Sequence, residues 1–262
     1  MLADHTVLIT GAGSGLGLAR SFREQGAALA LLEVSAAKSD ALRAEFPDAL
    51  VHQGDASKLT DVEAARAAIA ERFTRLDALV SVHGIFDGLV QLKDVPLDRI
   101  DSLFDELFHV NVKSNFLLAR VFAEMLEAAN GAIVLTTSNA AYAADGGGAF
   151  YTASKGALRS LVGQLAFEFA PHVRVNAVAP AGIASSQLRG PEALGMEGQS
   201  QADIPKDAFL AKFREVSLLS ELPTPEDHAA IYAFLASREN RIMTGQTVIA
   251  DQGLLNRGVL SG

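Results

Sequence analysis

Short apolar runs alternate with longer amphipathic segments along most of the 262-residue chain. Seven runs have the length of strands and are apolar at nearly every position. They are residues 6–10, 28–33, 49–53, 77–82, 131–137, 173–179 and 246–250. Strands that are apolar throughout are typical of a parallel sheet buried on both faces.

Segments of helical length and period lie between these runs, such as residues 61–75, 97–128 and 151–170. Alternation of strands and helices predicts right-handed crossovers that place helices on both faces of the sheet. We therefore predict an α/β fold, with a seven-stranded parallel sheet in a single doubly wound Rossmann-type domain. No break in composition divides the chain, so the domain is expected to span residues 1–262.

The alternation is interrupted once, between Ile183 and Lys212, where Gly, Pro, Ser and charged residues crowd together. Such a stretch is typical of an insertion over a ligand site. Its apolar residues Leu188, Leu194, Met196 and Phe209 indicate either a lid that closes on an apolar ring or ordinary packing against a neighbouring helix.

Composition narrows the function classes. Apolar residues make up 49% of the chain, enough for a sizeable core, and the net charge of -9 opposes binding of nucleic acid. The chain has no cysteine, which excludes disulfides and thiolate zinc sites, and we assign no metal ligands. The first ten residues lack a basic region, and no apolar run is long enough to span a bilayer. We expect a cytoplasmic protein that binds neither membrane nor nucleic acid.

Ligands of open α/β sheets bind beyond the carboxyl ends of the strands. The first predicted strand leads directly into the glycine-rich run TGAGSGLG. Glycines let the backbone approach a pyrophosphate, and the following helix presents free N–H groups to it. The alternative is a turn that merely connects strand and helix. The predicted cofactor-binding residues of this run are Gly11, Gly13, Ser14, Gly15, Leu16 and Gly17.

Glu33 ends the second predicted strand, 22 residues beyond Gly11. A carboxylate there can accept hydrogen bonds from the ribose hydroxyls of an adenosine, and it would repel a 2'-phosphate. Neither residues 12–17 nor residues 34–37 include an Arg or Lys that would reverse this preference. The sequence therefore favours NAD over NADP as cofactor, with a solvated surface acid as the alternative interpretation of Glu33.

Further candidates follow the next strands. Asp55, with Ala56 beside it, follows the third strand and can reach the adenine amino group, while Gly84 would let backbone lie against the adenosine. Asn111 is a polar residue within the apolar run FHVNVKS, so it is either a catalytic residue or a hydrogen-bonded core amide.

Tyr151 and Lys155 are four residues apart, which places them on one face of a helix. A phenol titrates near 10, so it acts as a base near neutral pH only if its pKa falls by about three units. A neighbouring ammonium favours the phenolate in this way. Ser138, thirteen residues before Tyr151, adds a second hydroxyl. The alternative is an ordinary surface pair on an amphipathic helix.

Taken together, TGAGSGLG, Asp55, Asn111, Ser138, YTASK and VRVNAVAPAGI resemble the short-chain dehydrogenase/reductase family in order and spacing over nearly the whole chain. The resemblance implies an NAD-dependent oxidoreductase with the catalytic tetrad Asn111, Ser138, Tyr151 and Lys155. Tyr151 and Lys155 would also contact the cofactor.

The same resemblance implies that Pro180, Ile183 and Ser185 hold the nicotinamide end of the cofactor. The chain departs from the family after the fourth strand, where it reads SVHG and has Val82 and His83 in place of the usual Asn and Ala. His83 is either a ligand-facing switch or a packed histidine beside the cofactor.

A closer likeness narrows the substrate. TTSNAAYAADGGGAFYTASK, LRGPEALGM and LLNRGVLSG look like the bacterial cis-dihydrodiol dehydrogenases, which oxidise arene cis-dihydrodiols to catechols in aromatic catabolism. Those enzymes have a Ser-Asn pair that corresponds to Ser138 and Asn139, and a second polar group suits a vicinal diol. The expected substrate contacts are Ser138, Asn139 and Tyr151; a strand-end turn is the alternative role of Asn139.

Two other functions remain open: oxidation or reduction of another cyclic alcohol or ketone, such as a hydroxysteroid, terpene alcohol or sugar, and NAD sensing without catalysis. The family resemblance also implies a homotetramer in which the helices predicted at 97–128 and 151–170 pair between subunits.

Overall fold

The computed structural model describes residues 1–14, 17–183, 186–203, 205–219, 221 and 223–257. Within these residues the strands form one sheet in the order β3-β2-β1-β4-β5-β6-β7, and all neighbouring strands are parallel. Each strand overlaps a predicted run, which confirms the seven-stranded parallel sheet. The strands are β1 (Thr6–Thr10), β2 (Ala28–Glu33), β3 (Leu50–Gln53), β4 (Ala78–Ser81), β5 (Ala132–Thr136), β6 (Arg174–Pro180) and β7 (Thr247–Ala250).

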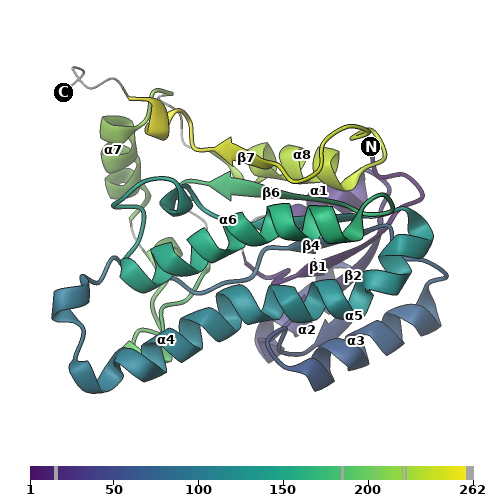
Figure 1. The fold of residues 1–262 in the computed structure, drawn as a ribbon, viewed down its shortest axis with the longest axis horizontal. Helices are drawn as coiled ribbons and strands as arrows, with labels where there is room; N and C mark the ends of the chain where they lie inside the picture. Colours follow the sequence, from purple (N-terminus) through teal and green to yellow (C-terminus); the bar gives the residue numbers. More distant parts are fainter. Residues whose placement is uncertain (15–16, 184–185, 204, 220, 222, 258–262) are drawn as a thin grey trace.

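Helices cover both faces of the sheet (Figure 1). One face carries α1 (Leu18–Glu24), α2 (Ala36–Glu45) and α8 (Pro225–Ala236). The other carries α3 (Leu59–Arg72), α5 (Ser114–Ala129) and α6 (Ala149–Phe169). Two further helices, α4 (Ile100–Phe108) and α7 (Lys206–Val216), lie toward the side of the molecule where the strands end. None of the described helices is long and apolar enough to cross a membrane.

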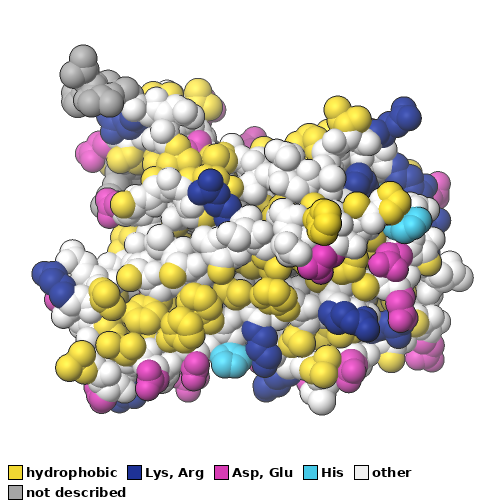
Figure 2. Space-filling view, viewed as in Figure 1, with side chains coloured by type: hydrophobic (Ala, Val, Ile, Leu, Met, Phe, Trp, Pro, Cys, Tyr) yellow, Lys and Arg dark blue, Asp and Glu magenta, His cyan; other side chains and the backbone are white. Residues whose placement is uncertain are grey.

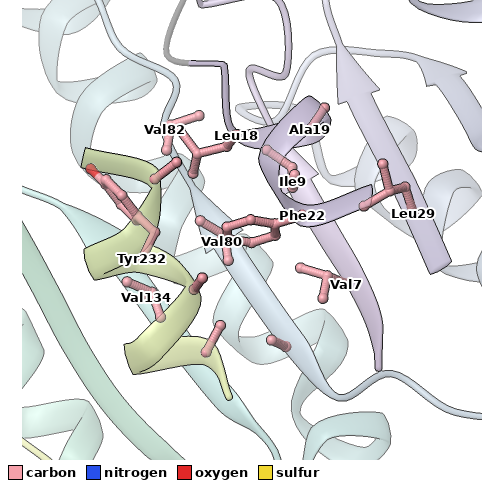
Figure 3. Close-up of a cluster of buried hydrophobic side chains, with 14 of the residues drawn as sticks. Val7, Ile9, Leu18, Ala19, Phe22, Leu29, Val80, Val82, Val134 and Tyr232 are labelled. Carbon is pink, nitrogen blue, oxygen red and sulfur yellow. The ribbon is translucent and has the colours of Figure 1, made fainter. Parts of the chain in front are cut away.

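Alternate residues of the strands supply two separate hydrophobic cores, except that β7 contributes to the first core only. Val7 and Ile9 of β1 pack into one core, and Leu8 between them packs into the other. Figure 3 shows Phe22 of α1 and Tyr232 of α8 covering the strands on the first side. A fully buried apolar side chain of this size stabilises the fold by about 1.5–3 kcal/mol. Burial on both faces explains why the strands are apolar throughout.

The segment predicted as one helix over residues 97–128 is less regular than expected. A 3₁₀ turn at Leu97–Arg99 precedes α4, and a π-helical turn at His109–Lys113 joins α4 to α5. A π turn inserts one extra residue into a helix and often marks a functional position. Asn111 lies in this turn and is almost fully buried.

The strand order reverses between β1 and β4, so the loops that follow these two strands diverge at the carboxyl edge of the sheet. The loop after β1 begins at Gly11, and the loop after β4 contains His83. A Cβ atom on Gly11 would lie 2.7 Å from Cα of His83, and its φ of +71° also favours glycine. Gly11 therefore allows the two loops to meet at this point.

Candidate active site and cofactor groove

A cavity of about 590 Å³ extends along the carboxyl edge of β1, β2, β3 and β4. Six of the twelve described residues that were predicted to bind a cofactor line it: Gly11, Ser14, Glu33, Asp55, Ala56 and Gly84. Gly15, Leu16 and Ser185, which were predicted as well, lie outside the described residues. The strand-end rule thus brings side chains from four separate strands into one groove.

Ser14 fits a residue that binds a ligand. Its hydroxyl is buried, lines the groove and has no hydrogen-bond partner in the described structure. Buried polar atoms are nearly always paired, so an unpaired hydroxyl here suits a group that accepts its hydrogen. Gly17 follows as the N-cap of α1, whose free N–H groups favour an anion.

Glu33 is 5% exposed and is already bonded to the protein. Its Oε2 accepts from the N–H of Gly13 at 2.9 Å, and its Oε1 accepts from the N–H of Ser35 at 3.0 Å. A carboxylate has about four lone-pair sites, so two remain for ribose hydroxyls. Glu33 therefore shapes the glycine-rich loop in addition to the role predicted from the sequence.

Lys38 is a groove residue that the sequence search missed, because the search for cations ended at residue 37. It lies on the first turn of α2 and lines the cavity. A Cβ atom on Gly13 would lie 2.8 Å from Cδ of Lys38 and 2.9 Å from Oε2 of Glu33. The aliphatic part of the Lys38 side chain and the Glu33 carboxylate thus flank the same part of the groove.

Asp55 and Gly84 lie at different depths in the groove. Oδ1 of Asp55 accepts from the N–H and the hydroxyl of Ser57, at 2.8 and 2.7 Å, which fixes the turn after β3. Gly84 lies deeper, where a Cβ atom would be 3.1 Å from Oδ1 of Asn111. Glycine at this position leaves space between the groove and the side chains of Asn111 and Lys155.

His83, in the loop after β4, contacts Thr10 at the end of β1 and Ser114 at the start of α5, next to the π turn. Its Nε2 lies 2.6 Å from Oγ of Ser114 and its Nδ1 lies 2.8 Å from Oγ1 of Thr10. The Ser114 hydroxyl donates to the carbonyl oxygen of Val110, so Nε2–H of His83 donates to Ser114 and Nδ1 accepts from Thr10. Burial, and then the charge of Lys155, lower the pKa of His83 to about 4. The structure favours the packed, neutral histidine.

A second, smaller cavity of about 70 Å³ contains three of the four predicted catalytic residues, Ser138, Tyr151 and Lys155, whereas Asn111 does not line it. Ser138, Asn139, Tyr151 and Lys155 line it, and each is less than 9% exposed. Pro180 and Ile183, at the end of β6, lie on its rim. Ser14, His83 and Leu188 line both cavities, so the two adjoin.

The hydroxyl and amide expected to hold a substrate lie side by side. Oγ of Ser138 donates to Oδ1 of Asn139 at 3.2 Å and accepts from the N–H of Ala140 at the same distance. Both side chains line the second cavity, and Asn139 also begins the 3₁₀ turn Asn139–Ala141, so its contact with a substrate stays a prediction.

The side chain of Tyr151 is buried and shielded from water. Burial raises its pKa to about 12; the hydrogen bond with Ser138 acts in the opposite direction, and the charge of Asp87 adds to the increase. Nζ of Lys155 lies 5.5 Å from the centre of the Tyr151 ring. The spacing-based expectation of a lowered pKa therefore differs from the structure, because burial outweighs the nearby ammonium in the protein alone.

The side chain of Asn111 joins two parts of the structure by hydrogen bonds. Its Oδ1 accepts from the N–H of Ile85 at 2.8 Å, and its Nδ2 donates to the carbonyl oxygen of Ile85 and to Oγ of Ser154, both at 3.0 Å. The amide is fully bonded, as in the core-amide interpretation. It fixes the loop after β4 against α6, which carries Tyr151.

The segment predicted as a lid covers the groove but is bonded to the scaffold. Glu106 of α4 accepts from the N–H groups of Glu192 and Ala193, both at 3.0 Å, and its ion pair with Arg189 measures 2.7 Å. An isolated antiparallel bridge joins Arg189 to Ser200. This part of the segment is therefore fixed to α4.

The apolar residues of this segment have different roles. Leu188 lines both cavities, whereas Leu194 packs against the core around Leu103 and Leu107. A Cβ atom on Gly190 would lie 2.5 Å from Cβ of Met196. The Phe209 side chain lies outside the described residues. Ordinary packing thus describes Leu194 and Met196, and Leu188 alone of the described three faces the catalytic cavity.

The chain is similar to known proteins both in sequence and in structure. Residues 10–255 match the family described as enoyl-(acyl carrier protein) reductase. The chain is 42% identical over 262 residues to the 3-phenylpropionate-dihydrodiol/cinnamic acid-dihydrodiol dehydrogenase of Escherichia coli O7:K1 (strain IAI39 / ExPEC), covering 98% of this chain and 96% of the relative. The enzyme of the same name from Shigella boydii serotype 4 (strain Sb227) is similar to the same extent.

Among solved structures, the 3-ketoacyl-(acyl-carrier-protein) reductase from Brucella melitensis complexed with NADH is similar, with a TM-score of 0.81 and 29% identity. The match covers 97% of this chain and 99% of that chain. These likenesses extend over nearly the whole chain and so include both cavities.

Proposed function

Because the chain belongs to the short-chain dehydrogenase/reductase family of oxidoreductases, which act on CH–OH donors, we propose that it oxidises an arene cis-dihydrodiol to a catechol with NAD. One observation carries this proposal: Ser138 and Asn139 present a hydroxyl and an amide side by side in the cavity that also contains Tyr151 and Lys155. Two polar anchors suit two vicinal hydroxyls. The relatives that are 42% identical are named for dihydrodiol substrates, which supports the same class here.

The residues of the groove fit a dinucleotide. The unpaired hydroxyl of Ser14 and the N-terminus of α1 suit a pyrophosphate, and Glu33 retains acceptor sites for ribose hydroxyls. The solved relative complexed with NADH supports a nicotinamide cofactor. The carboxylate of Glu33 favours NAD over NADP because it repels a 2'-phosphate.

In the proposed reaction Ser138 holds the reacting hydroxyl, and Asn139 holds its neighbour. Tyr151, as phenolate, removes the hydroxyl proton while the hydrogen on the same carbon leaves with its electron pair as hydride. When bound, NAD supplies the acceptor for that hydride. The resulting hydroxyketone tautomerises to a catechol, and the gain of aromaticity favours oxidation.

Two charges would lower the pKa of Tyr151 for this step. Lys155 stands 5.5 Å from the ring centre, and a positively charged nicotinamide would add a second cation. Asn111 keeps the loop after β4 and α6 together, so that Tyr151 stays opposite Ser138.

The test is a parallel assay of purified protein with NAD and three substrate groups: a cis-dihydrodiol with an uncharged ring, a cis-dihydrodiol with a carboxylate side chain, and a panel of cyclic secondary alcohols. Formation of NADH and catechol from a dihydrodiol, and neither product with Tyr151→Phe, is the expected result. Turnover of the alcohols alone would replace the proposal with a dehydrogenase for another alcohol or ketone. NAD binding without any turnover would indicate a sensing protein.

We also propose a homotetramer in which α4, α5 and α6 pair between subunits. Figure 2 shows hydrophobic side chains gathered over the region of α4, α5 and α6. Phe104, Phe116 and Phe167 of these helices are 46%, 52% and 80% exposed. Burial of such a patch between subunits would be favourable. Gel filtration with light scattering tests this, and a monomer at micromolar concentration would contradict it.

A further inference from the structure

Asp87 is a buried carboxylate that the proposed reaction does not use. It follows β4 in the loop that begins at Val82, and it is 1% exposed. Moving a carboxylate out of water is costly unless hydrogen bonds compensate, so its partners show what it does. Both of those partners lie on α6, the helix that carries Tyr151 and Lys155.

The two carboxylate oxygens cap the first turn of α6. Oδ1 accepts from the N–H of Gly148 at 2.8 Å, and Oδ2 accepts from the N–H of Tyr151 itself at 2.9 Å. Gly148 is the N-cap residue of α6 and supplies no side-chain cap. The first N–H groups of a helix have no partner within the helix, so a buried helix end needs acceptors from elsewhere. Asp87 supplies them from a loop 61 residues earlier in the chain.

The approach of Asp87 depends on glycine. A Cβ atom on Gly148 would lie 2.5 Å from Oδ2 of Asp87 and 2.5 Å from the carbonyl oxygen of Val90. A Cβ atom on the preceding Gly147 would collide with Cδ1 of Tyr151. Gly148 therefore lets the loop after β4 approach the helix end, and Gly147 leaves room for the Tyr151 ring.

The neighbouring residue in the loop contacts the same tyrosine. The ring of Phe86 meets the ring of Tyr151 edge to face, with centres 4.9 Å apart and planes at 88°. Phe86 thus restricts the ring, and Asp87 restricts the backbone nitrogen of the same residue. The loop holds Tyr151 at both of its ends.

We propose that Asp87 is a positioning residue for Tyr151: its carboxylate caps α6 from the loop after β4 and sets both the place and the charge environment of the phenol. The charged or titratable groups around that phenol are Lys155 from α6, Asp87 from this loop and Tyr232 from α8, with His83 beside Lys155. Among them Asp87 disfavours the phenolate, while its own charge is stabilised at the N-terminus of α6.

The first test compares Asp87→Asn with Asp77→Asn. Asp77 is also a buried acid, 3% exposed, but it lies beside the first residue of β4, at the opposite edge of the sheet, where it pairs with Arg75 and Arg238. Both variants lose buried carboxylate bonds and should melt at lower temperature. Only Asp87→Asn should also lower kcat, by about 10- to 100-fold, since small displacements of a catalytic group have effects of this size.

The second readout is independent of the proposed substrate. Phenolate absorbance is titrated in each variant, and the contribution of Tyr151 is isolated by subtraction of the matching variant that also carries Tyr151→Phe. Removal of the Asp87 charge should shift the Tyr151 transition toward lower pH by about one unit, whereas Asp77→Asn should leave it in place. A failed assay for dihydrodiols would leave this titration unaffected, so the proposed function and the role of Asp87 are tested separately.

If Asp87→Asn does not fold, Asp87→Glu replaces it, because this variant keeps the charge and displaces it by one methylene. Asp87→Glu should lower kcat, or the absorbance change on formation of the phenolate, with little change in the pKa of Tyr151. An Asp87 variant that melts lower than wild type but keeps both kcat and the Tyr151 titration would overturn the proposal and leave Asp87 with a purely structural role.

Discussion

Nζ of Lys155 donates to the main-chain carbonyl oxygen of Thr136 at 3.0 Å. This contact directs the ammonium to the end of β5, beneath the catalytic cavity, and it holds a side chain that is 2% exposed. Burial lowers the pKa of Lys155 to about 8. The charged amine therefore destabilises the folded protein, and we expect Lys155 to be present for its function.

We predict that Lys155→Met abolishes turnover and raises the melting temperature at pH 6 by a few degrees. A lysine with a lowered pKa in the folded state destabilises the protein wherever it is protonated, so the cost is complete below pH 8 and disappears as the pH rises toward 10.5. The methionine variant removes a cost of about 3 kcal/mol, partly offset by loss of the bond to Thr136. Thermal melts from pH 6 to 10 test this, and a variant less stable than wild type at pH 6 would contradict it.

Tyr151→Phe should lower kcat about 10³-fold or more and leave the Kd for NAD within about threefold, because the hydroxyl acts on the substrate proton. The ring remains, so its edge-to-face contact with Phe86 should persist and keep α6 in place. Calorimetric titration with NAD and a dihydrodiol assay measure the two effects. Normal rates in this variant would exclude Tyr151 as the base.

Glu33→Ala should reduce the preference for NAD over NADP by about tenfold, since it removes the negative charge that opposes a 2'-phosphate. Lys38 lines the same part of the groove and offers an ammonium to that phosphate. The matched control is Glu33→Ala combined with Lys38→Ala, in which the gained NADP affinity should be lost. Equal NADP affinity in the single and double variants would show that Lys38 takes no part.

His83→Ala should reduce the loss of folding stability that occurs as the pH falls from 6.5 to 4. The pKa of His83 is about 4 in the folded state against an ordinary value of 6.5, so the unfolded chain binds more protons between these values. Stability is therefore lost as the pH falls from 6.5 to 4, by about 3 kcal/mol. Denaturant midpoints at pH 7 and 4.5 test this. The same midpoint difference in wild type and variant would assign the acid sensitivity to other groups.

The sheet could be predicted from the sequence because burial on both faces makes each strand uniformly apolar, and the structure keeps all seven. The groove followed from one topological rule: side chains after parallel strands meet at one edge, which brings Glu33, Asp55 and Gly84 together. Ser138, Tyr151 and Lys155 could be predicted to share a cavity because a strand end and one helix face converge there.

Other features depend on loop paths and burial, which spacing does not encode. Asp87 bonds to residues 61 and 64 positions later, and nothing in the local sequence indicates that reach. The pKa of Tyr151 rises instead of falling because the phenol is enclosed, and a four-residue spacing carries no information on enclosure. Lys38 was missed for a simpler reason: the groove continues onto the first turn of α2.

The π-helical turn that carries Asn111 also sets the phase between α4 and α5. Residues 12 apart in a regular α-helix point about 120° apart, at 100° per residue. With one residue absorbed by the turn they behave as residues 11 apart and differ by about 20°. Buried Leu107 is thereby aligned with buried Ala119, and exposed Phe104 with exposed Phe116. A regular α-helical turn in place of the π turn, with no residue removed, would rotate α5 by about 100° and expose its apolar side, so this irregularity keeps the two helices in phase.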